Sequence, residues 1–199
     1  MNDEEVCCKA SRNEIIRRHY YDLSKLAQKG NNENEVHKIA LIMKQAKITT
    51  DDRKTTVAAR LRKEQSGVHS AAIELHDGTI ITSRTSGLLG PSAALILNAT
   101  KHLAGIADEV KLIPEAMISP IQRTKVDFLH GKTPRLHTDE VLVALSLLST
   151  TDDNCRRALE QLPKFDGCQV HSTVMLSEVD RKIFQKLGVG LTCDPVRKE

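Results

Sequence analysis

The sequence predicts an α/β fold in which a helical N-terminal segment, residues 1–66, precedes a three-layer α/β/α subdomain, residues 67–199, with a mixed five-stranded sheet. Three observations predict this architecture. Residues 69–106 have the pattern of a β-hairpin that leads directly into an apolar helix. Farther along, apolar runs of strand length alternate with helical segments, which is typical of a largely parallel sheet covered on both faces. The first 66 residues show helical spacing throughout.

The N-terminal segment predicts three helices. A capping box formed by Ser11 and Glu14 indicates the start of the first helix, and Gly30 its end. The second helix carries its apolar residues on one face over 36–43, and the third, 57–65, is highly charged. Such helices cannot bury their apolar faces alone, so they need the rest of this chain or another chain as a partner.

The hairpin is the most clearly marked element. Ala71, Ile73 and Leu75 recur at every second position, which is the period of a strand. The Asp-Gly pair at 77–78 predicts a two-residue loop, because a type I′ turn needs a positive φ at both central positions. The β-branched stretch 79–85 is the expected return strand.

An apolar helix follows the hairpin. Residues 92–104 are apolar on almost every side, which predicts a buried helix. Pro91 suits the first helical position and Gly105 the left-handed cap at the other end.

The rest of the chain predicts alternating strands and helices. Strands are expected at 110–113, 168–175 and 189–193, and helices at 120–129, 138–148, 152–162 and 177–187. Because residues 141–148 are apolar on all sides, we expect that helix to be buried.

Composition excludes several classes of protein. The 199 residues include 29 basic and 26 acidic side chains, and a net charge of +3 is too small for a nucleic-acid-binding surface. There is no Trp, and two Tyr and three Phe are too few for a base-stacking platform. No apolar run is long enough to span a membrane, and the acidic N-terminus is unlike a secretory signal. Five cysteines without a C-x-x-C pair indicate reduced thiols in a cytoplasmic protein.

A hairpin that feeds a buried helix also opens the cytidine-deaminase-like fold. The zinc chemistry of that fold needs a His- or Cys-x-Glu at the start of the helix and a later P-C-x-x-C. Here the helix starts with Gly-Pro-Ser-Ala-Ala at 90–94, which offers neither a ligand nor a general acid. We therefore expect cytidine-deaminase-like topology without zinc ligands, and neither a metal site nor a cofactor.

Three polar stretches are candidate binding sites: the loop 85–92 before the buried helix, the basic loop 132–140, and the strand 168–174. A helix N-terminus can bind an anion, but loop 85–92 lacks the spacing of a phosphate loop. If the basic loop and the strand meet at one sheet edge, they would form a pocket for a phosphate or a carboxylate. In the alternative interpretation, the loops are solvated or cap helices and the strand histidine is a satisfied core residue. The tentative ligand-binding residues are Ser86, Ser92, Lys132, Arg135, His137, Glu140, His171, Ser172 and Thr173.

Several motifs resemble the uncharacterised family called domain of unknown function 1846 (UPF 0371). They include SAA at 92–94, KHLAGI at 101–106, PIQR at 120–123, PRLHTDEVL at 134–142, HST at 171–173 and LTCDP at 191–195, with EIIRR at 14–18 and DRK at 52–54 upstream. The resemblance implies no reaction and no role for any residue. It implies a chain about twice this long whose N-terminal half has a glycine-rich, phosphate-loop-like segment. The present chain would then be the C-terminal half, either truncated or encoded apart from its partner.

Two functional hypotheses follow. In the first, the chain is the non-catalytic structural or assembly half of a larger protein that binds a nucleotide or phosphate. It would then self-associate or pair with an N-terminal partner half, because its N-terminal helices need a partner for their apolar faces. In the second, it binds a small ligand or is an enzyme domain. It would act on a phosphorylated or nucleotide-like compound through loop 132–140 and strand 168–174.

Overall fold

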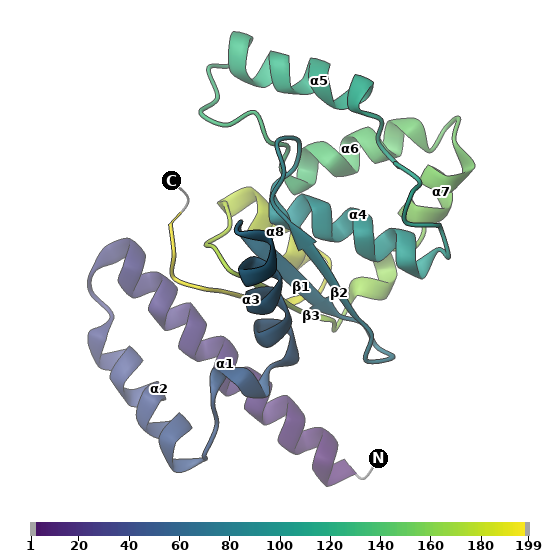
Figure 1. The fold of residues 1–199 in the computed structure, drawn as a ribbon. Helices are drawn as coiled ribbons and strands as arrows, with labels where there is room; N and C mark the ends of the chain where they lie inside the picture. Colours follow the sequence, from purple (N-terminus) through teal and green to yellow (C-terminus); the bar gives the residue numbers. More distant parts are fainter. Residues whose placement is uncertain (1–2, 198–199) are drawn as a thin grey trace.

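The computed structural model describes residues 3–197, which form an α/β structure with helices on both faces of one sheet (Figure 1). The four strands lie in the order β2-β1-β3-β4. They are β1 (Ser70–Glu74), β2 (Ile80–Arg84), β3 (Gln169–Ser172) and β4 (Gly190–Cys193). The predicted α/β class is confirmed.

Eight α-helices surround the sheet in this part of the chain. They are α1 (Asp3–Lys29), α2 (Glu33–Gln45), α3 (Lys54–Ser66), α4 (Pro91–Leu103), α5 (Glu115–Arg123), α6 (Thr138–Leu148), α7 (Asp153–Leu159) and α8 (Glu178–Lys186). Short turns of 3₁₀-helix lie at Thr50–Asp52 and Leu162–Phe165, and a π-helical turn at Thr124–Phe128 extends α5. None of the helices described is both long and apolar enough to cross a membrane.

The sheet differs from the prediction in the number and direction of its strands. Residues 110–113 lie in the loop between α4 and α5 and form no strand, although Leu112 and Ile113 are buried. A run of four apolar residues signals burial and does not by itself indicate backbone pairing. Only β3 and β4 are parallel, because β1 is antiparallel to both of its neighbours. The predicted five-stranded sheet with cytidine-deaminase-like topology is therefore not confirmed over residues 3–197.

The hairpin itself is confirmed, apart from its turn. β1 and β2 pair antiparallel over their whole length. The N–H of Leu75 donates to the carbonyl oxygen of Thr79 at 2.9 Å, so the loop spans three residues, 76–78. Gly78 has a φ of +84°, whereas Asp77 has no positive φ. This is the pattern of a three-residue loop with glycine in the left-handed position, and the two-residue turn was a wrong prediction.

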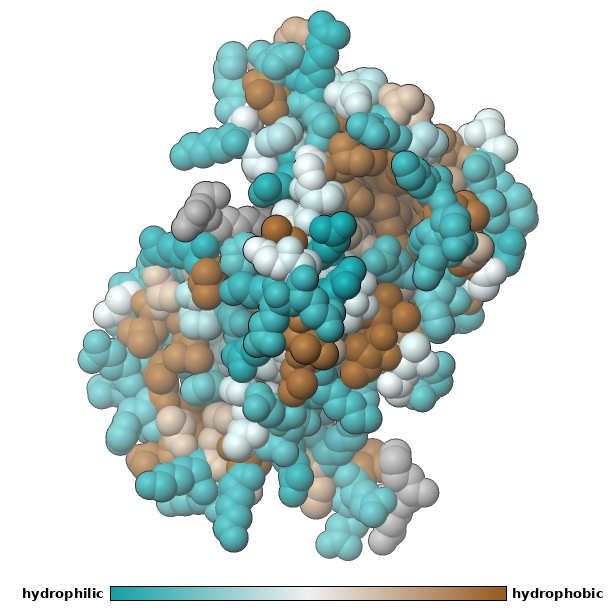
Figure 2. Space-filling model, in the orientation of Figure 1, coloured by the Kyte–Doolittle hydropathy of each residue, from teal (hydrophilic) through white to brown (hydrophobic). Residues whose placement is uncertain are grey.

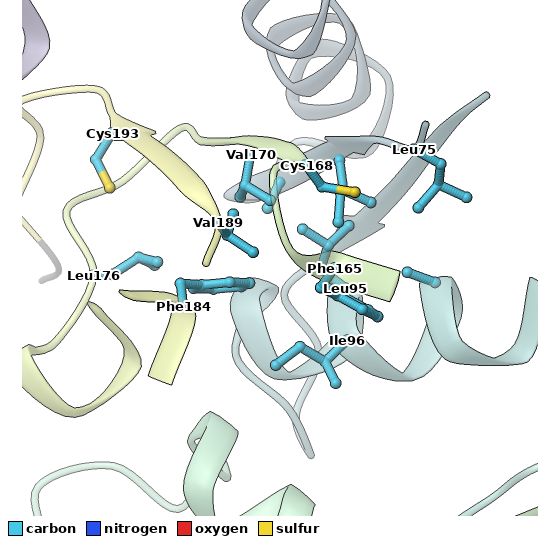
Figure 3. Packing of buried hydrophobic residues seen from close by; sticks show 13 residues of the cluster. Leu75, Leu95, Ile96, Phe165, Cys168, Val170, Leu176, Phe184, Val189 and Cys193 are labelled. Atoms are coloured by element: carbon cyan, nitrogen blue, oxygen red, sulfur yellow. The ribbon is translucent and has the colours of Figure 1, made fainter. Parts of the chain in front are cut away.

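One face of the sheet is apolar and packs against α4 and α8 (Figure 1). α4 starts at the predicted Pro91, and the chain turns at Gly105 with a φ of +62°, as expected. Side chains from the strands, α4, α8 and the Leu162–Phe165 turn form the main core (Figure 3). Its fully buried members include Ile73, Leu95, Ile96, Phe165, Val170 and Phe184.

The opposite face carries polar side chains and is covered by α3 and α1. α1 begins at Asp3, so the predicted capping box at Ser11 lies inside the helix, while Gly30 ends it with a φ of +67°. α2 folds back along α1 on the side away from the sheet (Figure 1). The pair has its own small core of Ile16, Tyr20, Met43 and Ile48.

Two predictions about the segment 115–148 were wrong. α5 begins at Glu115 and holds Pro120 inside it, where a missing N–H costs one helical hydrogen bond. α6 is not buried on all sides, because Val143 is 60% and Leu147 65% exposed. An apolar stretch shows that a helix can be buried but not which of its sides has a neighbour to cover it.

Candidate functional site

His171 lies at the centre of a buried polar cluster on the α1–α3 face of the sheet. The register of β3 places it between Ala72 of β1 and Thr192 of β4. Its side chain has no exposed surface. His171 Nδ1 is 2.9 Å from the Thr192 hydroxyl, and Nε2 is 3.5 Å from Asp194 Oδ1. Both ring nitrogens therefore face polar atoms of the chain itself.

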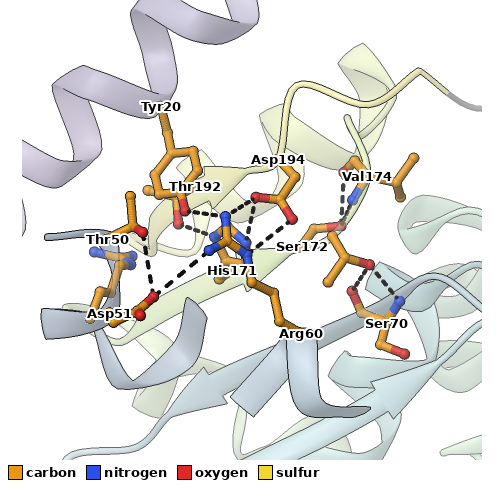
Figure 4. Close-up of polar contacts among 12 residues, drawn as sticks. Tyr20, Thr50, Asp51, Arg60, Ser70, His171, Ser172, Val174, Thr192 and Asp194 are labelled. Carbon is orange, nitrogen blue, oxygen red and sulfur yellow. Dashed lines mark hydrogen bonds and ion pairs between the residues drawn. The ribbon is translucent and has the colours of Figure 1, made fainter. Parts of the chain in front are cut away.

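Asp194 connects His171 to Arg60 of α3, which in turn contacts Tyr20 of α1 (Figure 4). Arg60 of α3 donates from Nη2 to Asp194 Oδ1 at 2.8 Å and to the Tyr20 hydroxyl at 3.0 Å. The ring of Tyr20, from α1, lies 4.9 Å from the ring of His171. The cluster therefore holds α1, α3, β3 and β4 together.

Burial and charge determine the protonation of this cluster. Burial lowers the pKa of His171, and the nearby Asp194 carboxylate only partly opposes that shift, so the imidazole is neutral at pH 7. Burial also acts to raise the pKa of Asp194, but hydrogen bonds from His171 and Arg60 outweigh it and hold that pKa at about 2. A neutral histidine beside a carboxylate resembles a general base, yet a completely buried ring cannot meet a substrate.

The loop 132–140 forms a second polar cluster. Arg135 Nε donates to the carbonyl oxygen of Ser86 at 2.9 Å, so these two predicted residues do lie together. Glu140 accepts from the N–H of His137 at 2.7 Å and from Lys125 Nζ at 2.8 Å. These contacts close the loop onto the first turn of α6.

A buried carboxylate completes this second cluster. Asp180 has no exposed surface, and its Oδ1 accepts from the Thr138 N–H at 3.0 Å and the Thr138 hydroxyl at 2.9 Å. Its Oδ2 lies 3.2 Å from His137 Nδ1 and accepts from the Ser177 hydroxyl at 2.8 Å. Burial opposes ionisation, but hydrogen bonds led by His137 hold the pKa of Asp180 well below its usual range. The N-terminus of α6 thus binds the chain's own carboxylates.

The two predicted stretches do not share one pocket. His137 bonds to Asp180 of α8, which packs on one face of the sheet, whereas His171 faces α1 and α3 on the other. Alternate residues of a strand point to opposite faces, so the position of His171 in β3 decides its side.

The other predicted residues have local roles. The Ser172 hydroxyl donates to the Val174 carbonyl oxygen at 2.9 Å, and the Thr173 hydroxyl to that of Ser70 at 3.2 Å. Ser92 is buried at the start of α4, and Lys132 is exposed in its loop. As ligand-binding residues they stay predictions. Among residues 3–197, no three His, Cys, Asp or Glu side chains gather closely enough to hold a metal ion.

Sequence reasoning missed Tyr20, Arg60 and Asp194. They come from three separate elements, and helical or strand periodicity does not show that they meet. One signal was available: Asp194 follows β4 directly, and polar residues at the carboxyl ends of parallel strands often belong to a site.

Residues 51–199 match the family model described as "Domain of unknown function DUF1846, C-terminal", and residues 1–47 match "Domain of unknown function DUF1846, N-terminal". The chain belongs to this family. A UPF0371 protein of Corynebacterium aurimucosum is 49% identical over 196 residues, which is 98% of this chain and 39% of the relative. One from Streptococcus pneumoniae is 41% identical over 195 residues, covering 98% of this chain and 40% of the relative. The chain thus spans about two fifths of the length of these curated relatives.

The comparisons confirm the family and correct one part of the prediction. The chain is not limited to the C-terminal half, because residues 1–47 belong to the N-terminal family model. The boundary between the two matches falls at 47–51, after α2 and before α3. This point lies inside the helical segment 1–66 that the sequence predicts, and helical periodicity continues across it.

Proposed function

We propose that this chain is the non-catalytic assembly portion of a larger UPF0371-family protein, and that α1 and α2 dock the N-terminal remainder of that protein. One observation carries the proposal. Residues 1–47 match the N-terminal family model, yet within residues 3–47 they form only a helical pair beside the sheet. Two helices cannot bury their apolar faces alone, so a domain to which they belong needs further chain to complete its core.

The docking surface is the groove between α1 and α2. It is lined mainly by apolar side chains, with Ile15 from α1 and Ile39 and Ile42 from α2. Ile42 is 45% exposed and its neighbour Leu41 46% exposed, and Figure 2 shows apolar surface among the hydrophilic residues of this pair. Exposed apolar side chains gathered in one groove are the feature that supports docking at this place.

The proposed occupant is the rest of the N-terminal family domain. About three fifths of the length of these curated relatives lies outside the part that this chain matches. We infer that part of this additional chain completes the domain to which α1 and α2 belong, and that it shares their core. A second copy of this chain would be the alternative occupant.

The second hypothesis, a phosphorylated or nucleotide-like ligand at loop 132–140, is less well supported. Asp180 and Glu140 already occupy N–H groups at the start of α6, where an anion would bind. Their charges would also repel a phosphate. We retain the division into a helical segment, 1–66, and an α/β subdomain, 67–199, and a cytoplasmic location, as further proposals.

Co-expression tests the docking proposal. We expect the N-terminal remainder of the C. aurimucosum relative to co-purify with this chain, and Ile42→Asp to weaken the complex by about tenfold or more, because it buries an unpaired charge in the groove. Light scattering would give the stoichiometry, and competition with wild-type chain the relative affinity.

The matched control is Val143→Asp, which puts the same charge on the exposed side of α6. It should leave the complex unchanged. Absence of any complex, or self-association that Ile42→Asp disrupts in place of it, would refute docking of the N-terminal remainder.

A further inference from the structure

A small pocket opens between α1 and the ends of β3 and β4. It has a volume of about 80 Å³. α1 contributes Arg17 and Tyr20, the chain just after β3 contributes Leu176, and β4 contributes Thr192. Arg181 of α8 stands at the same opening. The pocket therefore joins parts of the chain that match different family models.

The position of the pocket is typical of a ligand site. β3 and β4 are the parallel pair of the sheet, and both run toward this opening. In open α/β sheets, ligands bind outside the carboxyl ends of parallel strands. Pockets also form preferentially where two domains meet.

The floor of the pocket is coupled to the His171 cluster. Tyr20 and Thr192 are each 2% exposed and line the pocket on one side. On the other side, Tyr20 accepts from Arg60 and Thr192 contacts His171. The floor is thus fixed by hydrogen bonds that do not depend on a ligand.

The chemistry of the walls selects an anion with an apolar stem. Arg17 is held by Glu14 through bonds of 2.7 and 2.8 Å, which offset its charge. Arg181 is exposed and can offer the planar donor pair that matches a carboxylate. The rest of the lining is mixed: Leu176 and Leu191 are apolar, whereas Tyr21, Ser24 and Gln28 of α1 carry polar groups.

Size limits the ligand. One water occupies about 10–15 Å³ of such a cavity, so about 80 Å³ accommodates roughly five to eight non-hydrogen atoms. A phosphate needs more donors than the guanidinium of Arg181 alone supplies, usually including backbone N–H groups. A monoanion costs less to bring against apolar walls than a dianion.

We propose that this pocket binds a small monocarboxylate, with the carboxylate on Arg181 and a short apolar tail against Leu176 and Leu191. Neither the family descriptions nor the docking proposal assigns such a site. The docking groove uses α2 and the outer side of α1, so the two proposals can fail independently.

NMR titration of the full chain with butyrate tests the proposal. We expect saturable amide shifts at 175–176 and 191–193, and about tenfold or more weaker binding in Arg181→Gln, which loses the charged hydrogen bonds. The control is Arg123→Gln, because the Arg123 side chain is 76% exposed on α5, outside the pocket. It should bind butyrate as the wild type does.

Two results would overturn the site. One is a set of shifts that grow without saturation or that Arg123→Gln weakens as much as Arg181→Gln. The other is inorganic phosphate binding at the same amides more tightly than butyrate, which would contradict the carboxylate class.

Discussion

Replacing Arg53 with alanine is expected to lower the free energy of unfolding by about 3 kcal/mol. Arg53 is 1% exposed and lies immediately before α3. It donates to Gln169 Oε1 at 2.8 Å, to the Val170 carbonyl oxygen at 3.1 Å, and to the Gly190 carbonyl oxygen. These acceptors are neutral, so burial lowers the pKa of Arg53 to about 10. Alanine would leave one buried and two part-buried acceptors on two neighbouring strands without this donor.

Urea unfolding followed by circular dichroism measures the effect. Arg12→Ala, at an exposed position of α1, is the matched control and should change stability by less than about 0.5 kcal/mol. Arg53→Met keeps much of the side-chain volume but not the donors, so it should remain destabilising by about 2 kcal/mol. If Arg53→Met were as stable as the wild type, the donors would not be the cause.

The elements that the sequence predicted correctly depend on residues that are close together in the chain. The hairpin, the start of α4 at Pro91 and the cap at Gly105 each depend on residues close together in the chain, and all three were found. The strand predicted at 110–113 was wrong. Four consecutive apolar residues occur in a buried loop as well as in a strand, so the pattern does not show whether the backbone pairs. The exposed side of α6 was not predicted, because the sequence pattern does not show which other elements pack against this helix.

The polar clusters were predictable only in part. His171 was identified, and its interpretation as a satisfied core residue fits its contacts with Thr192 and Asp194. Its other neighbour, Tyr20, lies 151 positions earlier in the sequence. Helix and strand periods act over a few residues, so a contact of this separation depends on how whole elements pack. The same limit hid the partnership of Thr138 with Asp180, 42 positions apart.

Replacing Asp194 with asparagine is expected to lower the free energy of unfolding by about 2 kcal/mol at pH 7 and by about half as much at pH 3. The pKa of Asp194 falls from 3.8 to about 2 in the folded chain. A carboxylate with a lowered pKa stabilises the fold above its unfolded pKa, and this stability is lost as the pH falls through the folded value. The difference between wild type and variant should therefore shrink between about pH 4 and pH 2.

His171 makes the stability depend on pH in a separate, higher pH range. Its pKa is lowered by burial from 6.5, so below about pH 6.5 the unfolded chain takes up a proton that the folded chain resists. Stability should thus fall on acidification first near pH 6 and again below pH 4. Asp194→Asn should reduce the second fall without removing it, because the pKa of Asp180 is also lowered in the folded chain.

Asp51→Asn is the matched control, because Asp51 also lies near Arg60, at 3.8 Å, but is 71% exposed. Urea midpoints from pH 7 to pH 3 should be the same for this control and the wild type. A constant difference between Asp194→Asn and wild type across that range would show that Asp194 stabilises the fold by packing alone, and that its charge does not hold α3 to the end of β4.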